Sequence, residues 1–353
     1  VANGSTIKLS QDIRWPHSLG LLYSAFTYYL GFQVNEGEYK LMGLSSYGKP
    51  KFYDKIMKEL VDVLEDGSFK LNMDYFSFTH DNIMISEKFE KLFNCPVRKE
   101  DSKIEQIHFD IGASIQLVLE EILLKIVNYV YKKTNKKNLC LGGGVALNGV
   151  ANYRIHKEGP FDNIYIPPSP GDAGSAIGCA LYAYYSFLKN DRTTIPDPVE
   201  SVQDNIYLGP EYKNDEILSF LESYDIPYEK FGNNELLSKT AKLIEEQNVI
   251  GWYQGRMEWG PRALGNRSIL ADPRNAKMKD ILNKKIKHRE SFRPFAPSIL
   301  EEYASEYFEI DIPSPYMLFV PKVKKPEVIP AVSHIDGTGR LQTIDVKTSP
   351  KYH

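Results

Sequence analysis

Arginine residues gather in one short part of the chain, where their spacing suits the binding of a small anion. Six of the 11 arginines lie between Arg256 and Arg293, and residues 251–300 carry a local charge of +7 in a chain of net charge −3. A guanidinium group presents a planar fork of N–H donors that matches phosphate and carboxylate. The intervening glycines and prolines predict tight, rigid turns: Gly255, Gly260, Gly265, Pro261, Pro273, Pro294 and Pro297. We interpret the segment as anion-binding loops; the alternative is a basic surface exposed to solvent.

A second candidate site is a glycine loop near the middle of the chain. Gly142, Gly143 and Gly144 follow a short apolar run, and Asn148 lies one turn further on. Consecutive glycines before a helix expose backbone N–H groups that can hold phosphate, and close packing of the loop explains such glycines about as often. The segment is neither a Walker sequence nor a Gly-x-Gly-x-x-Gly fingerprint, so both interpretations stay open.

Further candidate residues are polar side chains that each have an ordinary structural explanation. Asp172, in Ser169-Pro-Gly-Asp-Ala-Gly, is either a helix cap or a ligand. Lys40 could reach a phosphate, but an ion pair with Glu38 at the surface is the simpler interpretation. His334 and Arg340 flank an Asp-Gly turn and either join the anion site or are ordinary turn residues. The scattered histidines, with no His-x-x-x-His pair, indicate no histidine metal site.

Apolar spacing indicates which elements position these residues. Residues 110–131 have the period of an amphipathic helix, and strand–loop–helix units follow at 139–157 and 163–188. This alternation is typical of a layered α/β domain. Residues 189–206 have the composition of a linker, which places a domain boundary near residue 200. Beyond it, residues 234–247 are predicted to form a helix and residues 249–252 a strand that leads into the arginine segment.

Composition sets the broad class of protein. The 353 residues, 42% of them hydrophobic and 25% charged, are typical of a globular protein with two domains. A net charge of −3 predicts no general affinity for nucleic acid or membranes, and no apolar run is long enough to span a bilayer. Cys95, Cys140 and Cys179 are too few and too far apart for a disulfide framework, and the last two are predicted to be buried. The cytoplasm is the expected compartment, and the oligomeric state is left open.

In this order, the motifs resemble the nodulation-type O-carbamoyltransferases, which transfer a carbamoyl group to hydroxyls of sugars, antibiotics and other small metabolites. The resemblance extends from about His17 to Arg340. It rests on Pro-His-Ser-Leu-Gly at 16–20, Gly-Glu-Tyr-Lys-Leu-Met-Gly-Leu at 37–44, Asp-Ile-Gly-Ala-Ser-Ile-Gln at 110–116, the glycine loop, Ser-Pro-Gly-Asp-Ala-Gly, Gly-Pro-Arg-Ala-Leu-Gly-Asn-Arg-Ser and Arg-Glu-Ser-Phe-Arg-Pro-Phe-Ala-Pro.

The resemblance implies an α/β protein of two domains. Residues 1–200 would form an actin-like ATPase-fold (ASKHA) domain, incomplete at its N-terminus, that transfers the carbamoyl group. Residues 201–353 would form an α/β twisted-sheet domain, incomplete at its C-terminus, that makes carbamoyl-adenylate from carbamoyl phosphate and ATP and releases pyrophosphate. The implied acceptor is a hydroxyl group of a small molecule, with no nucleic acid or membrane as partner. Two family features are not found in this sequence, a histidine pair before His17 and an Asn-Thr-Ser segment near the end.

The resemblance also assigns roles to particular residues. Lys287 and Arg293 would be catalytic. The nucleotide and carbamoyl phosphate would be held by Arg262, Arg267, Arg289, His334, Arg340, Gly142, Gly143, Gly144, Asn148 and Lys40. Asp172 would bind a divalent metal such as Fe(II) or Mg(II). The alternatives are a small-molecule kinase or a threonylcarbamoyl-type transferase on the same first fold, and a non-catalytic nucleotide-binding module.

Overall fold

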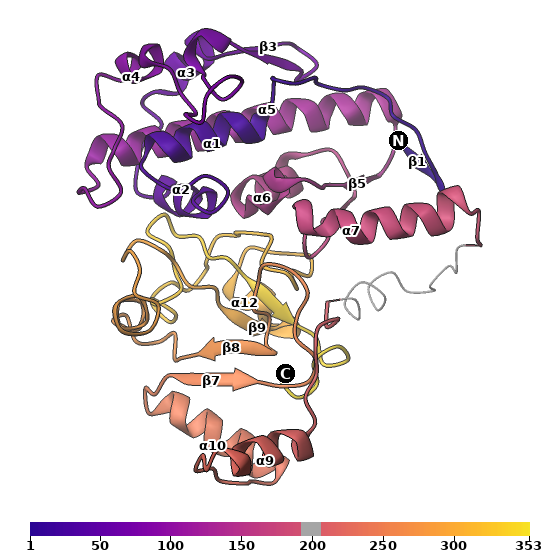
Figure 1. Ribbon diagram of the computed structural model, residues 1–353, viewed down its shortest axis with the longest axis vertical. Helices are drawn as coiled ribbons and strands as arrows, with labels where there is room; N and C mark the ends of the chain where they lie inside the picture. The colour runs from indigo at the N-terminus through magenta and orange to yellow at the C-terminus, as the bar shows by residue number, and fades with distance from the viewer. Residues whose placement is uncertain (192–205) are drawn as a thin grey trace.

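The structure is a computed structural model that describes residues 1–191 and 206–353, and the described part is a mixed α/β protein (Figure 1). Residues 1–191, the N-terminal part, contain β1 (Ala2–Asn3), β2 (Thr6–Ile7), α1 (Leu19–Tyr29), α2 (Glu38–Ser45), α3 (Tyr53–Glu59), β3 (Val61–Val63), β4 (Phe69–Leu71), η1 (Met73–Tyr75), α4 (Glu87–Leu92), α5 (Gln106–Thr134), β5 (Asn138–Cys140), η2 (Gly144–Leu147), α6 (Gly149–Glu158), β6 (Asn163–Tyr165), α7 (Asp172–Leu181) and η3 (Tyr182–Phe187).

Residues 206–353, the C-terminal part, contain the remaining elements. They are α9 (Asn214–Ser223), α10 (Asn233–Glu245), β7 (Ile250–Tyr253), β8 (Arg267–Leu270), α11 (Met278–Ile281), η4 (Leu282–Ile286), β9 (Ser298–Leu300), η5 (Glu301–Tyr303), α12 (Ala304–Tyr307) and β10 (Gln342–Ile344). Every sheet among the described residues has two strands; β7–β8 is antiparallel and β9–β10 is parallel.

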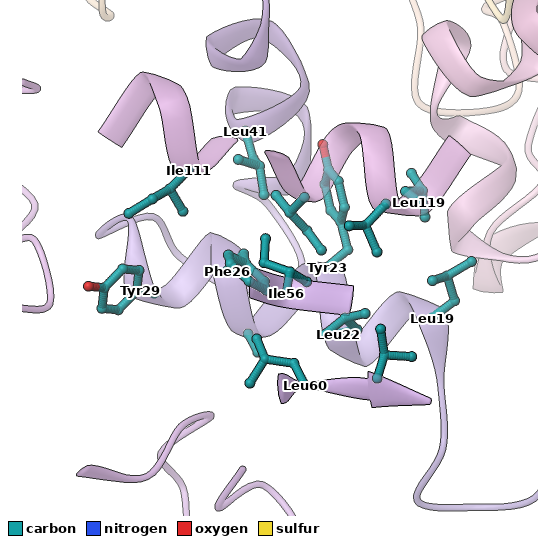
Figure 2. Close-up of a cluster of buried hydrophobic side chains, with 14 of the residues drawn as sticks. Leu19, Leu22, Tyr23, Phe26, Tyr29, Leu41, Ile56, Leu60, Ile111 and Leu119 are labelled. Atoms are coloured by element: carbon teal, nitrogen blue, oxygen red, sulfur yellow. The ribbon is translucent and has the colours of Figure 1, made fainter. Parts of the chain in front are cut away.

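The core of the N-terminal part is built around the long helix α5. Of the apolar residues that predicted this helix, Ile111, Ile115, Leu119 and Ile122 are buried. Ile126 and Val130, nearer its end, are half-buried. The four buried residues pack with α1, α2 and α3 in one cluster, part of which Figure 2 shows. The helix is longer than the pattern predicted, because Glu105 and His108 form a capping box before the apolar period starts. This core fixes α2, which carries Tyr39 and Lys40.

The aromatic side chains of α1, and that of Phe32 just after it, belong to this core rather than to an exposed stacking surface. Tyr23, Phe26, Tyr29 and Phe32 are at most 5% exposed, and Tyr28 packs against the same cluster. His17 is also structural, because its Nδ1 accepts a hydrogen bond from the Leu71 N–H.

The predicted strand–loop–helix units are present in the second half of the N-terminal part. Strand β5 leads through Gly142–Gly144 to α6, and β6 leads through a proline-rich loop to α7. The two strands are parallel and in register, with Leu139 opposite Ile164. Parallel pairing places both following loops at the same end of the strands, and the Gly143 N–H donates to the Pro170 carbonyl. The two glycine-containing loops therefore lie side by side.

A second core crosses the boundary between the two parts. Ala146 and Ile166 of the N-terminal part are buried in the same cluster as Phe308, Leu318 and Leu341. Polar contacts add to this seam. The side-chain amide of Asn152, 1% exposed, donates to the carbonyls of both Ala146 and Leu318, and Val320 N–H donates to Gly149 O. Apolar packing and satisfied backbone groups together hold the two parts against each other.

The structure contradicts one expectation, and another concerns residues outside the described ones. The prediction that Cys140 and Cys179 are buried is wrong: both are exposed, because β5 and α7 bury almost none of their side chains in the described structure. The linker and the boundary near residue 200 fall mostly within residues 192–205, outside the described residues. None of the helices among the described residues is long and apolar enough to cross a membrane.

Phe26 tests the first core. Its ring is fully buried and contacts Phe89 and Phe93, with centroids 5.1 and 5.8 Å away. Phe26→Ala leaves a cavity and is expected to lower the free energy of unfolding by about 3–5 kcal/mol. Urea denaturation measures the change. Phe187→Ala is the control, because Phe187 is 76% exposed and its loss is expected to change stability by less than about 0.5 kcal/mol. Equal effects of the two changes would contradict the described core.

Candidate active site

The predicted arginine loops meet helix α2 at the seam and enclose a cavity of about 90 Å³. We call it the arginine cavity. Its polar lining residues are Tyr39, Ser46, Arg262, Arg289, Arg293, His334 and Arg340. No aspartate or glutamate of the described residues lines it. The structure therefore brings together five residues that the sequence had proposed for the anion site, and it adds Tyr39, which the sequence analysis did not single out.

Several polar atoms at this cavity are buried but have no hydrogen-bond partner in the protein. They are Nε and Nη2 of Arg262, Nε of Arg340, Nε2 of His334 and the hydroxyl of Tyr39. A buried polar group without a partner typically costs about 1–3 kcal/mol, and more when it is charged. The guanidinium atoms can only donate hydrogen bonds. A ligand rich in acceptor oxygens would satisfy these atoms.

The charges in the cavity repel one another. Burial lowers the pKa of Arg340 well below its usual value, and the neighbouring Arg262, Arg289 and Arg293 lower it further. Burial likewise lowers the pKa of Arg262, and it lowers that of Arg289 to about 10, with Arg293 adding to both shifts. A guanidinium stays protonated at neutral pH. These shifts therefore express the cost of crowding positive charges, which a bound anion would remove.

His334 is a neutral member of the cavity. Its pKa is lowered from 6.5 to about 4, mainly by burial, with Arg340 and Lys279 contributing and Asp336 opposing. Its Nδ1 lies 3.0 Å from the Thr338 hydroxyl, inside the predicted Asp-Gly turn. The imidazole therefore adds polarity to the cavity without adding charge at neutral pH.

The arginine cavity opens into a larger cleft of about 1000 Å³ in the C-terminal part, which we call the C-terminal cleft. Arg262, Arg289 and Arg340 line both. Lys287 also lines the cleft; it is exposed and lies just after η4. Two of the arginines contact side chains that do not line the arginine cavity. Arg289 Nε donates to Asn283 Oδ1 at 2.7 Å, and Arg293 Nη1 lies 3.7 Å from Glu290 Oε2.

On its other side, the arginine cavity adjoins a cavity of about 650 Å³ in the N-terminal part, lined by Gly142, Gly143, Gly144, Asn148 and Asp172. We call it the glycine-loop cavity. Close packing does not explain these glycines, because a Cβ atom at any of the three would meet no atom within 4 Å, and Gly143 has a φ of +92°. Tyr39 and Met42 line both this cavity and the arginine cavity. The N-terminal and C-terminal candidate sites are thus neighbours.

Asn148 connects the glycine loop to the core. Its Oδ1 accepts from the Ala151 N–H as the cap of α6, and its Nδ2 donates to Gln116 Oε1 at 2.9 Å. Gln116 in turn accepts from the buried hydroxyl of Tyr23. Asn148 therefore anchors the loop, which is a structural role beside the predicted one in binding.

Asp172 is at the first position of α7, and its side chain makes no capping hydrogen bond, so the cap interpretation has no support. It lines the glycine-loop cavity, where a single carboxylate supplies one ligand of the several that a metal requires. The described residues contain no group of three His, Cys, Asp or Glu side chains that could hold a metal ion. They do not by themselves fit a metal site.

Two predicted ligands line none of the three cavities. Lys40 pairs with Glu290 at 2.8 Å rather than with Glu38, which instead accepts from Ser24. Arg267 pairs with the buried Glu258 at 2.9 Å. Both acids lie within the arginine-rich segment, and an acidic residue among so many arginines is the signal that could have predicted such pairs.

Comparison with known proteins identifies the family. Residues 1–181 match the family model described as the carbamoyltransferase N-terminus, and residues 241–353 match the carbamoyltransferase C-terminus. The chain belongs to the carbamoyltransferase family. The resemblance inferred from its motifs is thereby confirmed. The actin-like ATPase fold, the twisted sheet and the role of each residue remain predictions.

Three relatives illustrate the similarity. Nodulation protein NolO of Bradyrhizobium diazoefficiens is 38% identical, over 100% of this chain and 62% of the relative. Nodulation protein NolNO of Sinorhizobium fredii is 36% identical, over 100% of this chain and 50% of the relative. An uncharacterized protein of Synechocystis is 47% identical, over 99% of this chain and 60% of the relative. The chain therefore spans between half and about three fifths of the length of these relatives.

The ionisation of His334 provides a test of the cavity. NMR titration is expected to give it a midpoint near pH 4, and bound pyrophosphate is expected to raise that midpoint because an anion stabilises the imidazolium. As the pH falls, His334 takes up a proton in the unfolded chain near pH 6.5 and in the folded protein only near pH 4. The contribution of His334 to the free energy of unfolding is therefore lost as the pH falls from about 6.5 to about 4. The NMR signal of His334 is identified as the one that is missing from the His334→Gln variant. A midpoint near 6.5 that pyrophosphate does not move would contradict both the burial and the anion site.

Proposed function

We propose that the natural protein containing this chain is an ATP-dependent O-carbamoyltransferase. In the proposed first step, carbamoyl phosphate, ATP and water give carbamoyl-adenylate, orthophosphate and pyrophosphate. In the second, a hydroxyl group of a sugar, antibiotic or other small metabolite attacks the carbamoyl carbon, AMP leaves, and the hydroxyl proton is released. Membership of the carbamoyltransferase family supports carbamoyl as the group that is transferred. The proposed compartment is the cytoplasm.

The observation that carries the first step is the group of buried guanidinium atoms without partners in the arginine cavity. Carbamoyl phosphate and ATP are both anions, and their approach requires positive charge fixed in advance. Arg262 and Arg340 offer unpartnered donors, and no acidic residue of the described chain lines the cavity to compete for them. The adjoining C-terminal cleft, with Lys287 and Arg289, has room for a nucleotide. We assign the carbamoyl phosphate to the cavity and the nucleotide to the cleft.

The second step is assigned to the glycine-loop cavity. It adjoins the arginine cavity at Tyr39 and Met42, so the activated carbamoyl group would have a short path to the acceptor. The charged residues that line it are the acids Glu38 and Asp172, and no lysine or arginine of the described residues does so. This polarity suits a neutral acceptor hydroxyl better than an anion. Asp172 is proposed as one ligand of a divalent metal, and no step here is assigned to that metal.

Exchange of labelled pyrophosphate into ATP tests the function. Exchange that depends on carbamoyl phosphate is expected, because adenylation is the step that releases pyrophosphate reversibly. It is measured on this chain and on the natural protein that contains it. No exchange with either protein would contradict the proposal, and formation of ADP without exchange would favour the kinase alternative.

Arg293 tests the anion site. Arg293→Ala is expected to weaken the binding of carbamoyl phosphate or ATP by at least several-fold, because a charge-assisted contact is typically worth about 1.5–3 kcal/mol. Calorimetry measures both affinities. Arg256→Ala is the matched control, since Arg256 belongs to the same segment but is exposed and pairs with Glu211 at 3.9 Å. Unchanged affinity in Arg293→Ala would remove Arg293 from the site.

A further inference from the structure

The loop between β7 and β8 carries Arg262 into the arginine cavity, and it is closed by one buried carboxylate. Glu258 has a fully buried side chain. Its Oε1 accepts hydrogen bonds from the backbone N–H groups of Leu264, Asn266 and Arg267 at 2.6, 2.8 and 3.3 Å. Its Oε2 accepts from Arg267 Nε at 2.9 Å. One side chain therefore ties the start of the loop to its end, on both sides of Arg262.

This arrangement satisfies the carboxylate unusually well. A buried carboxylate normally carries a large desolvation cost, which several N–H donors and one guanidinium together offset. Glu258 lines none of the three cavities, so it does not touch their ligands. Its hydrogen bonds are all with the end of the loop and with Arg267, the first residue of β8.

Arg262, by contrast, has few restraints of its own. No hydrogen bond or ion pair joins its side chain to the described residues, and its Nε and Nη2 are buried without partners. Its guanidinium lies over the ring of Tyr39, 4.2 Å from the centroid. Such stacking restrains the distance from the ring but leaves the group free to slide across it. The position of Arg262 therefore depends on the backbone that carries it.

We propose that Glu258 is the positioning residue of Arg262: by closing the loop, it holds the guanidinium at the anion site. Arg267, paired with Glu258, belongs to this support and is not itself an anion ligand. The inference rests on the proposed function in one respect, since it assumes that Arg262 binds an anion of that reaction. Glu258, the one acid between residues 254 and 266, would thus serve the assembly of the site rather than its chemistry.

A double-mutant cycle tests the proposal, with pyrophosphate as the probe and calorimetry as the measurement. Glu258→Gln keeps an oxygen that can accept from the loop but removes the charge that Arg267 requires. It is expected to weaken pyrophosphate binding about tenfold or more, because displacing a binding group by about 1 Å can cost as much as a hundred-fold. In an Arg262→Ala background the same change is expected to have almost no effect. In an Arg293→Ala background it is expected to keep its full effect.

Controls separate positioning from general destabilisation. Asp110→Asn is the matched control: Asp110 is another buried carboxylate that accepts from a backbone N–H and pairs with a lysine, Lys51, but it lines none of the three cavities. It is expected to leave pyrophosphate affinity unchanged. If Glu258→Gln does not fold, Arg267→Lys, which keeps the positive charge but alters the contact with Oε2, replaces it in the cycle.

The outcomes are distinct. Unchanged affinity in Glu258→Gln, or an equal loss with and without Arg262, overturns the inference and leaves the proposed function intact. Absence of pyrophosphate binding in the unaltered natural protein removes the anion site, and with it both the inference and the assignment of the first step. A loss that disappears only in the Arg262→Ala background supports Glu258 as a positioning residue.

Discussion

Positive charge crowded around a small cavity that no described acid lines is the constraint on which this structure depends. Arg262, Arg289, Arg293 and Arg340 surround a small cavity that no acid of the described residues lines. Their mutual repulsion and their burial both oppose folding. The surrounding structure offsets this cost elsewhere, through the apolar core that crosses the seam and through supports such as Asn283 behind Arg289. A fold that maintains such a cavity gives up stability in exchange for readiness to bind an anion.

The acids that hold the arginine loops in place are as important to the site as the residues that line it. Acids occur in the arginine-rich segment, but none of them lines the arginine cavity: Glu258 closes a loop, and Glu290 holds Lys40 and Arg293. An acid that faced the cavity would neutralise the arginines and compete with the ligand. An acid behind them orders the loops while leaving the donors free. The local charge of +7 that marks this segment thus lies around a cavity that the acids of the segment do not line.

The sequence predicted the parts of the site that depend on residue type and local spacing. The period of 110–131 located α5, and Arg262, His334 and Arg340, which the sequence offered for one anion site, line one cavity. It could not predict what depends on the path of the chain in space. Arg267 has the same chemistry as Arg262, and only the loop geometry directs one to Glu258 and the other to the cavity. Cys140 lies in an apolar run, yet strand β5 has little packed against it, so its thiol is exposed.

Tyr39 forms part of the wall of two cavities at once, and this has a thermodynamic consequence. Its ring lies against Arg262 on one side, and it also lines the glycine-loop cavity on the other. A ligand that displaces the ring in one cavity changes the free energy of binding in the other. Linkage requires that influence to be reciprocal, so the factor by which an anion alters acceptor affinity equals the factor by which the acceptor alters anion affinity. If a ligand in one cavity moves this ring, the shared side chain couples binding in the two cavities.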